Sequence, residues 1–326
     1  MRVCDYIQAW LYGADGYYAN FREIGKEGDF ITSVSVTPLF GATLGAYLVS
    51  LIDDGKLSAN AAVVEIGAHQ GYLMADMIQM IYTLRPELLS TLSFVIIERF
   101  EALREVQRRY LEESFGDTIR VTFAADFSEL SGGEAYIVAN EIFDAFPAAL
   151  INGELEAWVE EGRIVWRPAD EALRDLAGRY GIQKGEVALG YESFAASMAK
   201  AFPQAIFLSF DYGERYPRQE MTMRLFVRHQ LYRFDEVDLR EYFGTCDVTY
   251  SVNFDHLIRA FEAEGWKLVR YGLQGHELIK MGLSSLLQTL EERLPYDLYL
   301  REVNKAKMLI HPDYFGVKFK VVEFIR

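Results

Sequence analysis

Short apolar runs alternate with amphipathic stretches of helical length along most of the first two thirds of the chain. Runs of this kind are typical of strands that are buried on both faces of a parallel sheet. We therefore predict strands at residues 61–67, 92–99, 119–127, 135–143 and 205–213. Residues 72–84 and 100–115 repeat apolar side chains at helical spacing, which predicts helices there. The alternation favours an α/β fold with a doubly wound, mostly parallel sheet.

The segments outside this alternation predict insertions. Residues 150–168 have the pattern of a hairpin with its turn at Asn152-Gly153-Glu154, and we expect Trp158 and Trp166 to pack on one of its faces. Residues 284–310 have a helical pattern, whereas residues 315–324 alternate like an antiparallel C-terminal strand. We predict a single domain over residues 1–326, with insertions at about 148–203, 214–251 and 284–312.

Composition narrows the class of protein. About half of the 326 residues are hydrophobic, as in a folded globular protein, and no apolar run approaches the roughly 20 residues of a membrane span. Cys4 and Cys246 are too few for a disulfide framework, and the chain begins without a signal-peptide pattern, so we expect a cytoplasmic protein. The net charge of -15 argues against general nucleic-acid binding and is compatible with a cationic partner.

The stretch "VVEIGAHQGYLMADMI" at residues 63–78 is the candidate cofactor loop. A dinucleotide-binding loop requires G-x-G-x-x-G, but after Gly67 the next two glycine positions hold His69 and Tyr72. A phosphate-binding P-loop would need Lys followed by Ser or Thr after Gly71, and neither is present. S-adenosylmethionine has no pyrophosphate and carries cationic amino and sulfonium groups, so this loop fits it better.

Acidic residues follow the first three predicted strands. Glu65 is placed to bind the cationic end of S-adenosylmethionine, Glu98 to accept the ribose hydroxyls and Asp126 to receive the adenine amino group. The carboxyl ends of parallel strands meet at one edge of a sheet, where ligands of such folds bind. The alternative is that Gly67 and Gly71 only make a tight turn and that the acids are solvated strand ends.

Seven motifs extend this pattern along almost the whole chain. They are "GYY" at 16–18, "GDFITSVSVTPLFG" at 28–41, the loop itself, "ANEIFDAFP" at 139–147, "FDYG" at 210–213, "MRLFVRH" at 223–229 and "DVTYSVNF" at 247–254. In these motifs and their order the chain resembles the MidA-like methyltransferases, a family that includes the mitochondrial arginine methyltransferase needed for assembly of respiratory complex I. The resemblance implies a Rossmann-like class I methyltransferase fold with S-adenosylmethionine as cofactor. It also implies an arginine of a protein substrate as the methyl acceptor, with a subunit of respiratory complex I as one candidate substrate, and leaves self-association open.

The resemblance also implies roles for single residues. Gly67, Gly71, Glu65 and Glu98 match the family's donor site. An N-terminal segment, residues 1–55, would cover the cofactor through the motif that holds Asp29, Phe30, Thr32 and Ser33. Asn140, Glu141 and Asp144 match its acidic motif, and the later polar positions correspond to Asp211, Tyr212, Arg224, His229 and Asp247.

Four positions depart from the family's pattern. His69 stands where a glycine is usual, Val34 and Ser35 replace Pro and Glu, and Asn253 replaces an Asp. We expect His69 to keep a negative φ and to point away from the donor, because a residue with a Cβ disfavours the left-handed region.

Methyl transfer requires a positioned nucleophile and no metal, and no pair of histidines has helical ligand spacing. A guanidinium acceptor is recognised by carboxylates, so Glu141, Asp144 and Asp29, with Asn140 beside them, are the candidate catalytic residues. The alternative is that Asp144 caps a turn and Glu141 is solvated. A non-catalytic assembly or chaperone-like protein and a small-molecule methyltransferase also remain open, since fold does not fix function.

Overall fold

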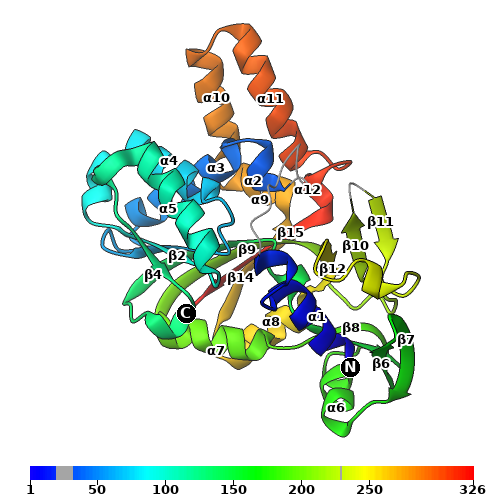
Figure 1. Ribbon diagram of the computed structural model, residues 1–326. Helices are drawn as coiled ribbons and strands as arrows, with labels where there is room; N and C mark the ends of the chain where they lie inside the picture. Colours follow the sequence, from blue (N-terminus) through cyan, green and yellow to red (C-terminus); the bar gives the residue numbers. More distant parts are fainter. Residues whose placement is uncertain (20–31, 228–229) are drawn as a thin grey trace. The chain divides into compact units, whose positions relative to one another are not determined.

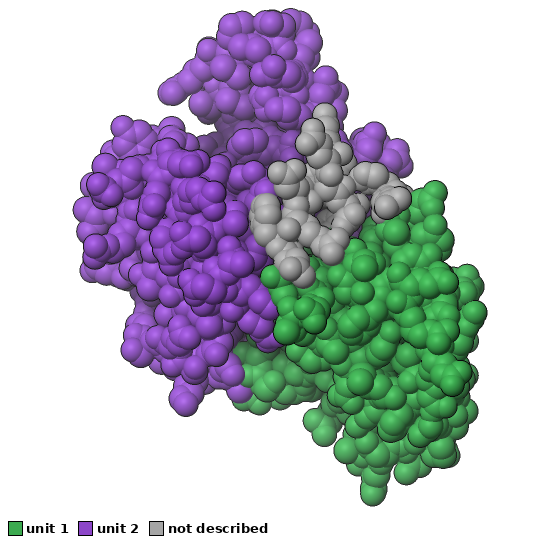
Figure 2. Space-filling model, in the orientation of Figure 1, with its two compact units in different colours: residues 1–30, 141–195, 212–264 green, residues 31–140, 196–211, 265–326 purple. Residues whose placement is uncertain are grey.

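The structure is a computed structural model that describes residues 1–19, 32–227 and 230–326. The chain forms two compact units, which Figure 2 shows in different colours. We call residues 31–140, 196–211 and 265–326 the sheet unit, and residues 1–30, 141–195 and 212–264 the insert unit.

The sheet unit is built on a mostly parallel sheet, as predicted. Its strands follow the order β14 (Lys267–Leu273), β15 (Phe319–Ile325), β9 (Gln204–Glu214), β4 (Glu134–Asn140), β1 (Ala62–Ile66), β2 (Ser93–Ile97) and β3 (Val121–Ala124). The pairs from β9 to β3 are parallel. β15 is antiparallel to β14, and Ala205 and Arg326 exchange backbone hydrogen bonds, which is the pattern of an antiparallel pair. The predicted fold class, including the reversed C-terminal strand, is confirmed.

Helices connect and cover these strands (Figure 1). They are α2 (Ser33–Val36), α3 (Leu39–Asp53), α4 (Tyr72–Leu84), α5 (Glu101–Phe115), α9 (Gln274–Lys280), α10 (Leu283–Arg293), α11 (Tyr296–Ile310) and α12 (Phe315–Lys318). α7 (Tyr191–Ala201) leads from the insert unit into the sheet unit. The predicted helices at 72–84 and 100–115 correspond to α4 and α5, and the predicted helical insertion corresponds to α10 and α11.

The core lies on both faces of the sheet because alternate strand residues point to opposite sides. On one face, Val63, Ile96 and Phe210 pack with apolar residues of α3 and α4. α3 and α4 approach closely at Gly45, where an added Cβ would lie 2.8 Å from the Met77 carbonyl oxygen. This packing fixes the start of α4, and with it the loop that precedes the helix.

The insert unit contains two small antiparallel sheets. One has the order β7 (Arg163–Pro168), β6 (Leu155–Glu160), β5 (Ala148–Asn152) and β8 (Lys184–Ala188). The other has the order β11 (Gln230–Arg233), β10 (Arg224–Val227) and β12 (Asp247–Thr249). The remaining elements are α1 (Val3–Tyr12), α6 (Glu171–Arg179), β13 (Val252–Asn253) and α8 (Phe254–Ala263).

The predicted hairpin at 150–168 is wrong in detail, because the segment forms three strands with two turns. The second turn holds Glu161 and Gly162 at φ values of 48° and 76°, as a tight hairpin turn requires. Trp166 pairs with Ala157 and Trp158 with Val165, so strand alternation places the two tryptophans on opposite faces. Their predicted packing on one face is therefore also wrong.

No helix in the described part of the chain is both long enough and apolar enough to cross a membrane. The organisation as a single domain with insertions stays a prediction.

Candidate cofactor and acceptor sites

The candidate cofactor loop joins the end of β1 at Ile66 to the start of α4 at Tyr72. Gly67 and Gly71 have φ values of 68° and 85°, which glycine adopts without steric cost. The Gly67 N–H donates to the Ile97 carbonyl at 2.9 Å, and the Gly71 N–H donates to the Ala68 carbonyl at 2.7 Å. The loop is thus tied both to the neighbouring strand β2 and to itself.

His69 has a φ of 46°, so the expected negative φ is wrong. The turn between Ile66 and Tyr72 therefore holds a residue with a Cβ in the left-handed region. This placement costs about 1 kcal/mol relative to glycine. The backbone conformation at this position therefore explains why the family that the chain resembles usually has glycine here.

Glu65 is the buried acid of the loop, with only 4% of its surface exposed. Its pKa is raised to about 8, mainly by burial and to a smaller extent by the charges of Asp76 and Glu98, against a backbone hydrogen bond from Met74 that lowers it. Its Oε2 atom has no hydrogen-bond partner among the described residues. A buried carboxylate oxygen with this deficit fits a cationic group, as the amino end of S-adenosylmethionine would supply.

Glu98 directly follows β2 and is also buried. The Phe100 N–H donates to its Oε1 at 3.1 Å, and Gln107 Nε2 donates to its Oε2 at 3.4 Å. The same Gln107 nitrogen donates to the His69 carbonyl at 3.0 Å. The sequence analysis missed Gln107, although the buried face of α5 reads Leu103, Gln107 and Leu111, with one polar side chain between two leucines.

Three predicted cofactor residues make structural hydrogen bonds. Asp126 is exposed, and its Oδ1 accepts from the Ser128 N–H at 2.6 Å. The side-chain hydrogen bond of Ser128, and after it this backbone bond, lower the pKa of Asp126. Thr32 and Ser35 form a reciprocal capping box at the start of α2, so Ser35 replaces the Glu of the family's pattern with a shorter cap. The Ser33 hydroxyl donates to Gln274 Oε1 at 3.2 Å. Cofactor contacts of these residues stay predictions.

The acceptor residues are divided between the units. Asn140 ends β4 in the sheet unit, in register with Phe210 of β9. Glu141 begins the insert unit with a φ of 54°, and it is half-buried. Asp29, Phe30 and His229 lie outside the described residues.

Asp144 and Asp247 are buried together in the insert unit. Asp144 lies within a single helical turn at 143–145, rather than capping it, and its carbonyl accepts from the Tyr250 N–H at 3.0 Å. Asp247 Oδ1 accepts from the Tyr18 hydroxyl at 2.9 Å and from the Val248 N–H at 2.9 Å. Burial is the main reason that the pKa of Tyr18 is raised, and the charges of Asp247, Tyr12 and Asp144 raise it as well. We call Asp144, Asp247 and Tyr18 the acid–tyrosine cluster.

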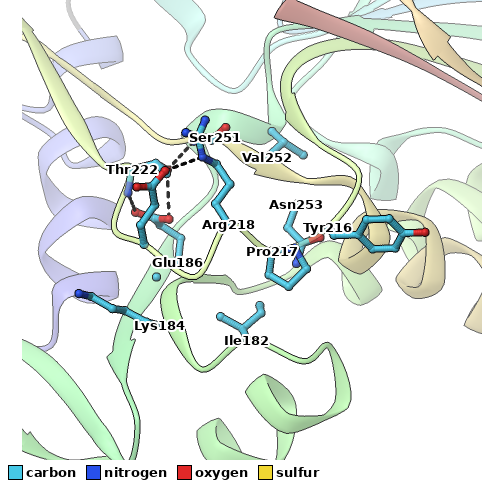
Figure 3. Close-up of a pocket in the computed structure, with 12 residues that line it drawn as sticks. Ile182, Lys184, Glu186, Tyr216, Pro217, Arg218, Thr222, Ser251, Val252 and Asn253 are labelled. Carbon is cyan, nitrogen blue, oxygen red and sulfur yellow. Dashed lines mark hydrogen bonds and ion pairs between the residues drawn. The ribbon is translucent and has the colours of Figure 1, made fainter.

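Figure 3 shows a separate pocket of about 300 Å³ in the insert unit. Its most buried charge, Glu186, accepts from the Thr222 N–H at 2.6 Å, from the Met223 N–H at 2.8 Å and from the Thr222 hydroxyl at 3.1 Å. Asn253 lines the pocket and caps α8, because its Oδ1 accepts from the N–H groups of Asp255 and His256. The Asn253 departure therefore preserves a helix cap, and both polar residues serve the local fold.

The family model described as "Putative S-adenosyl-L-methionine-dependent methyltransferase" matches residues 43–272. The chain belongs to this family, and it is an S-adenosylmethionine-dependent methyltransferase.

Two groups of proteins are similar over nearly the whole chain. The "Protein arginine methyltransferase NDUFAF7, mitochondrial" of Mus musculus is 27% identical over 97% of this chain and 79% of its own length, and that of Homo sapiens is 25% identical over 97% and 78%. A crystal structure of a "likely methyl transferase" from Burkholderia thailandensis, bound to S-adenosyl-homocysteine, is 26% identical with a TM-score of 0.84, covering 100% of this chain and 88% of that chain.

These relatives correct one prediction. The arginine methyltransferases among them are named as mitochondrial proteins, which contradicts the cytoplasmic location expected from the cysteine count and the N-terminal pattern. A low cysteine count is compatible with any reducing compartment, so it does not separate the cytoplasm from the interior of an organelle.

Proposed function

We propose that the protein transfers a methyl group to an arginine side chain of a protein partner, with subunits of respiratory complex I as the first candidates. The acid–tyrosine cluster carries this proposal, because it places two buried carboxylates close to one phenol in the insert unit. A guanidinium needs negative charge and several acceptors, which a neutral amide or hydroxyl substrate does not. The names of the mammalian relatives support the same acceptor.

In the sheet unit, Glu65 would bind the cationic amino acid portion of the donor and Glu98 its ribose hydroxyls. Gly67 and Gly71 keep the loop free of side chains where the donor passes. S-adenosylmethionine, once bound, supplies a methyl group on a positively charged sulfur, so the protein has mainly to position the acceptor and exclude water.

The acceptor residues have two tasks in this proposal. Glu141 and Asp144, with Asn140 and Asp29, orient one guanidinium nitrogen toward the methyl group, and one of the carboxylates takes up the proton that this nitrogen loses. Glu141 is held in a left-handed conformation directly after Asn140, and such strain in a residue with a Cβ is concentrated at functional sites.

The test is methyl transfer from labelled donor to purified subunits of respiratory complex I, followed by mass spectrometry of the labelled residue. Glu141→Gln is expected to lower transfer by at least roughly tenfold, about 1.4 kcal/mol, and to leave donor affinity nearly unchanged. Glu154→Gln, an exposed turn residue of the same unit, is the matched control and keeps full transfer.

Label on lysine or on a small metabolite would contradict the arginine acceptor. Full turnover of Glu141→Gln on the identified substrate would remove this residue from the acceptor site.

A further inference from the structure

Gln107 stands out as a fully buried polar side chain on the apolar face of α5. Its amide nitrogen donates to the His69 carbonyl at 3.0 Å and to Glu98 Oε2 at 3.4 Å. A Cβ on Gly71 would lie 3.8 Å from the Gln107 Cα, so α5 also packs against the end of the loop. One amide therefore contacts both the candidate cofactor loop and the candidate ribose acid.

The chemistry of the neighbours fixes the orientation of this amide. A carbonyl and a carboxylate are both acceptors, so only the NH₂ group can face them, with one N–H for each. The Oε1 atom is then left in the interior without a hydrogen-bond partner among the described residues. A leucine would fill the same space without burying a polar oxygen. The glutamine therefore lowers the stability of the fold relative to leucine, and its two N–H donors are the reason that we infer for its presence.

We propose that Gln107 is a positioning residue for donor binding, which holds the His69 carbonyl and the Glu98 carboxylate at a fixed separation and keeps Glu98 ionised. The proposal rests on the proposed role of Glu98 toward the ribose. Its first contact is made to the strained residue of the loop, where a hydrogen bond offsets part of the cost of the positive φ. Its second contact is made to a carboxylate that has lost most of its water.

The groups around Glu98 show why the hydrogen bond from Gln107 affects its ionisation. Burial raises the pKa of Glu98, whereas hydrogen bonds from the Phe100 N–H and from Gln107 lower it. Arg104 of α5 also lowers the pKa of Glu98 and donates to its backbone carbonyl at 2.6 Å. Without Gln107, Glu98 would take up a proton at a higher pH and would lose strength as an acceptor.

The test is calorimetric titration with S-adenosylhomocysteine from about pH 5 to about pH 9. Gln107→Leu removes both N–H donors and keeps a similar side-chain volume. Gln107→Glu keeps the shape of the side chain but places carboxylate oxygens against the His69 carbonyl and the Glu98 carboxylate, which are also acceptors. Both variants are expected to bind roughly tenfold more weakly near neutral pH, and the acid-side loss of affinity is expected to move upward by about one pH unit in Gln107→Leu. In turnover, the KM for the donor rises and kcat at saturating donor is kept.

Two controls separate the contributions. His69→Asn removes the imidazole and keeps both the backbone carbonyl that Gln107 binds and a residue that tolerates positive φ, so the acid-side loss of affinity stays at the wild-type pH. Glu98→Gln cannot ionise, so its affinity is weak and keeps only the pH dependence that Glu65 contributes, and in this background Gln107→Leu adds little.

Affinity that falls equally at every pH, together with a lowered melting temperature, would show that Gln107 only packs α5 and would overturn the proposal. Unchanged affinity in Gln107→Leu would overturn it as well. If Glu98→Gln itself bound like the wild type, the ribose role of Glu98 would fail first.

Discussion

At the scale of single residues, the protonation state of Glu65 is expected to change when the methyl donor binds. Its pKa of about 8 means that it is mostly protonated at neutral pH. An acid whose pKa is raised on folding contributes stability that is complete below its usual pKa of 4.5 and is lost as the pH rises through about 8. A bound cation would reverse this preference, because it stabilises the carboxylate.

We predict that donor binding at about pH 7 releases close to one proton. The binding enthalpy would then vary with the ionisation enthalpy of the buffer, which calorimetry in phosphate and in Tris measures directly. Glu65→Gln should lose this dependence and bind more weakly. Asp76 also has a pKa raised by burial, to about 7, so Asp76→Asn serves as the control that keeps the release. The same enthalpy in both buffers would contradict a cation-binding role for Glu65.

The strain at His69 gives a second prediction. His69→Gly should increase the free energy of unfolding by about 0.5 to 1 kcal/mol, since glycine accepts a φ of 46° without steric cost, although its greater unfolded-state entropy offsets part of the gain. His69→Val should decrease it, because a β-branched residue is least suited to this region. Urea denaturation of the pair measures both changes. A glycine variant less stable than the wild type would show that the imidazole's contacts outweigh the strain.

The sequence predicted the loop's acids better than its backbone. Glu65 and Glu98 directly follow buried apolar runs, so their burial could be expected from the strands alone. The φ of His69 depends on how the loop spans the gap between β1 and α4, and the bond from Gln107 depends on how α5 packs. Both are tertiary effects that residue spacing does not show.

At the scale of elements, the short helices depend on polar caps that the sequence analysis had assigned to the cofactor. Thr32 and Asp126 each accept a backbone N–H at a helix start. Asn253 does so for α8, whose apolar face is buried through Leu257, Ile258 and Phe261. Ser, Thr, Asp and Asn are strong N-cap residues, and such a residue near a strand end has two explanations that spacing alone does not separate.

We predict that Asn253→Ala lowers the free energy of unfolding by about 1 kcal/mol, because the Asp255 and His256 N–H groups lose their acceptor. Asn253→Asp restores the family's usual residue and should be neutral or slightly stabilising, since a negative charge suits a helix N-terminus. Thermal or urea unfolding of the two variants gives the comparison. A large loss in Asn253→Asp would mean that the side-chain NH₂ of Asn253 matters beyond the cap.

Strands buried on both faces were the easiest elements to predict. β14 was missed because its side chains are mostly half-exposed and it has no continuous apolar run. The β6–β7 turn was missed because Glu161-Gly162 lacks the Asn or Asp that usually marks such turns.

At the scale of the whole molecule, the chain passes repeatedly between the two units, at 140/141, 195/196, 211/212 and 264/265. β9 and α7 each contribute residues to both units. Shared elements oppose independent unfolding, because a strand cannot lose half of its pairing without weakening the rest.

We therefore predict a single cooperative unfolding transition, as expected of one domain with insertions. In Trp266→Phe the remaining tryptophans, Trp10, Trp158 and Trp166, all report on the insert unit. Saturation with S-adenosylhomocysteine at about 100 times Kd should stabilise the protein by about 2.7 kcal/mol and raise the fluorescence and circular-dichroism midpoints together. If the fluorescence midpoint did not change on ligand binding, the insert unit would unfold independently, and the protein would consist of two domains.

The position of β15 has a consequence for synthesis on the ribosome. This strand lies between β9 and β14, yet residues 319–325 are translated more than a hundred residues after β9 begins at Gln204. Until they leave the exit tunnel, the apolar edge of β9 has no lasting partner, and an open edge of this kind invites pairing with other nascent chains. The central sheet is therefore completed late, and the growing polypeptide is a natural client for a chaperone that shields strand edges.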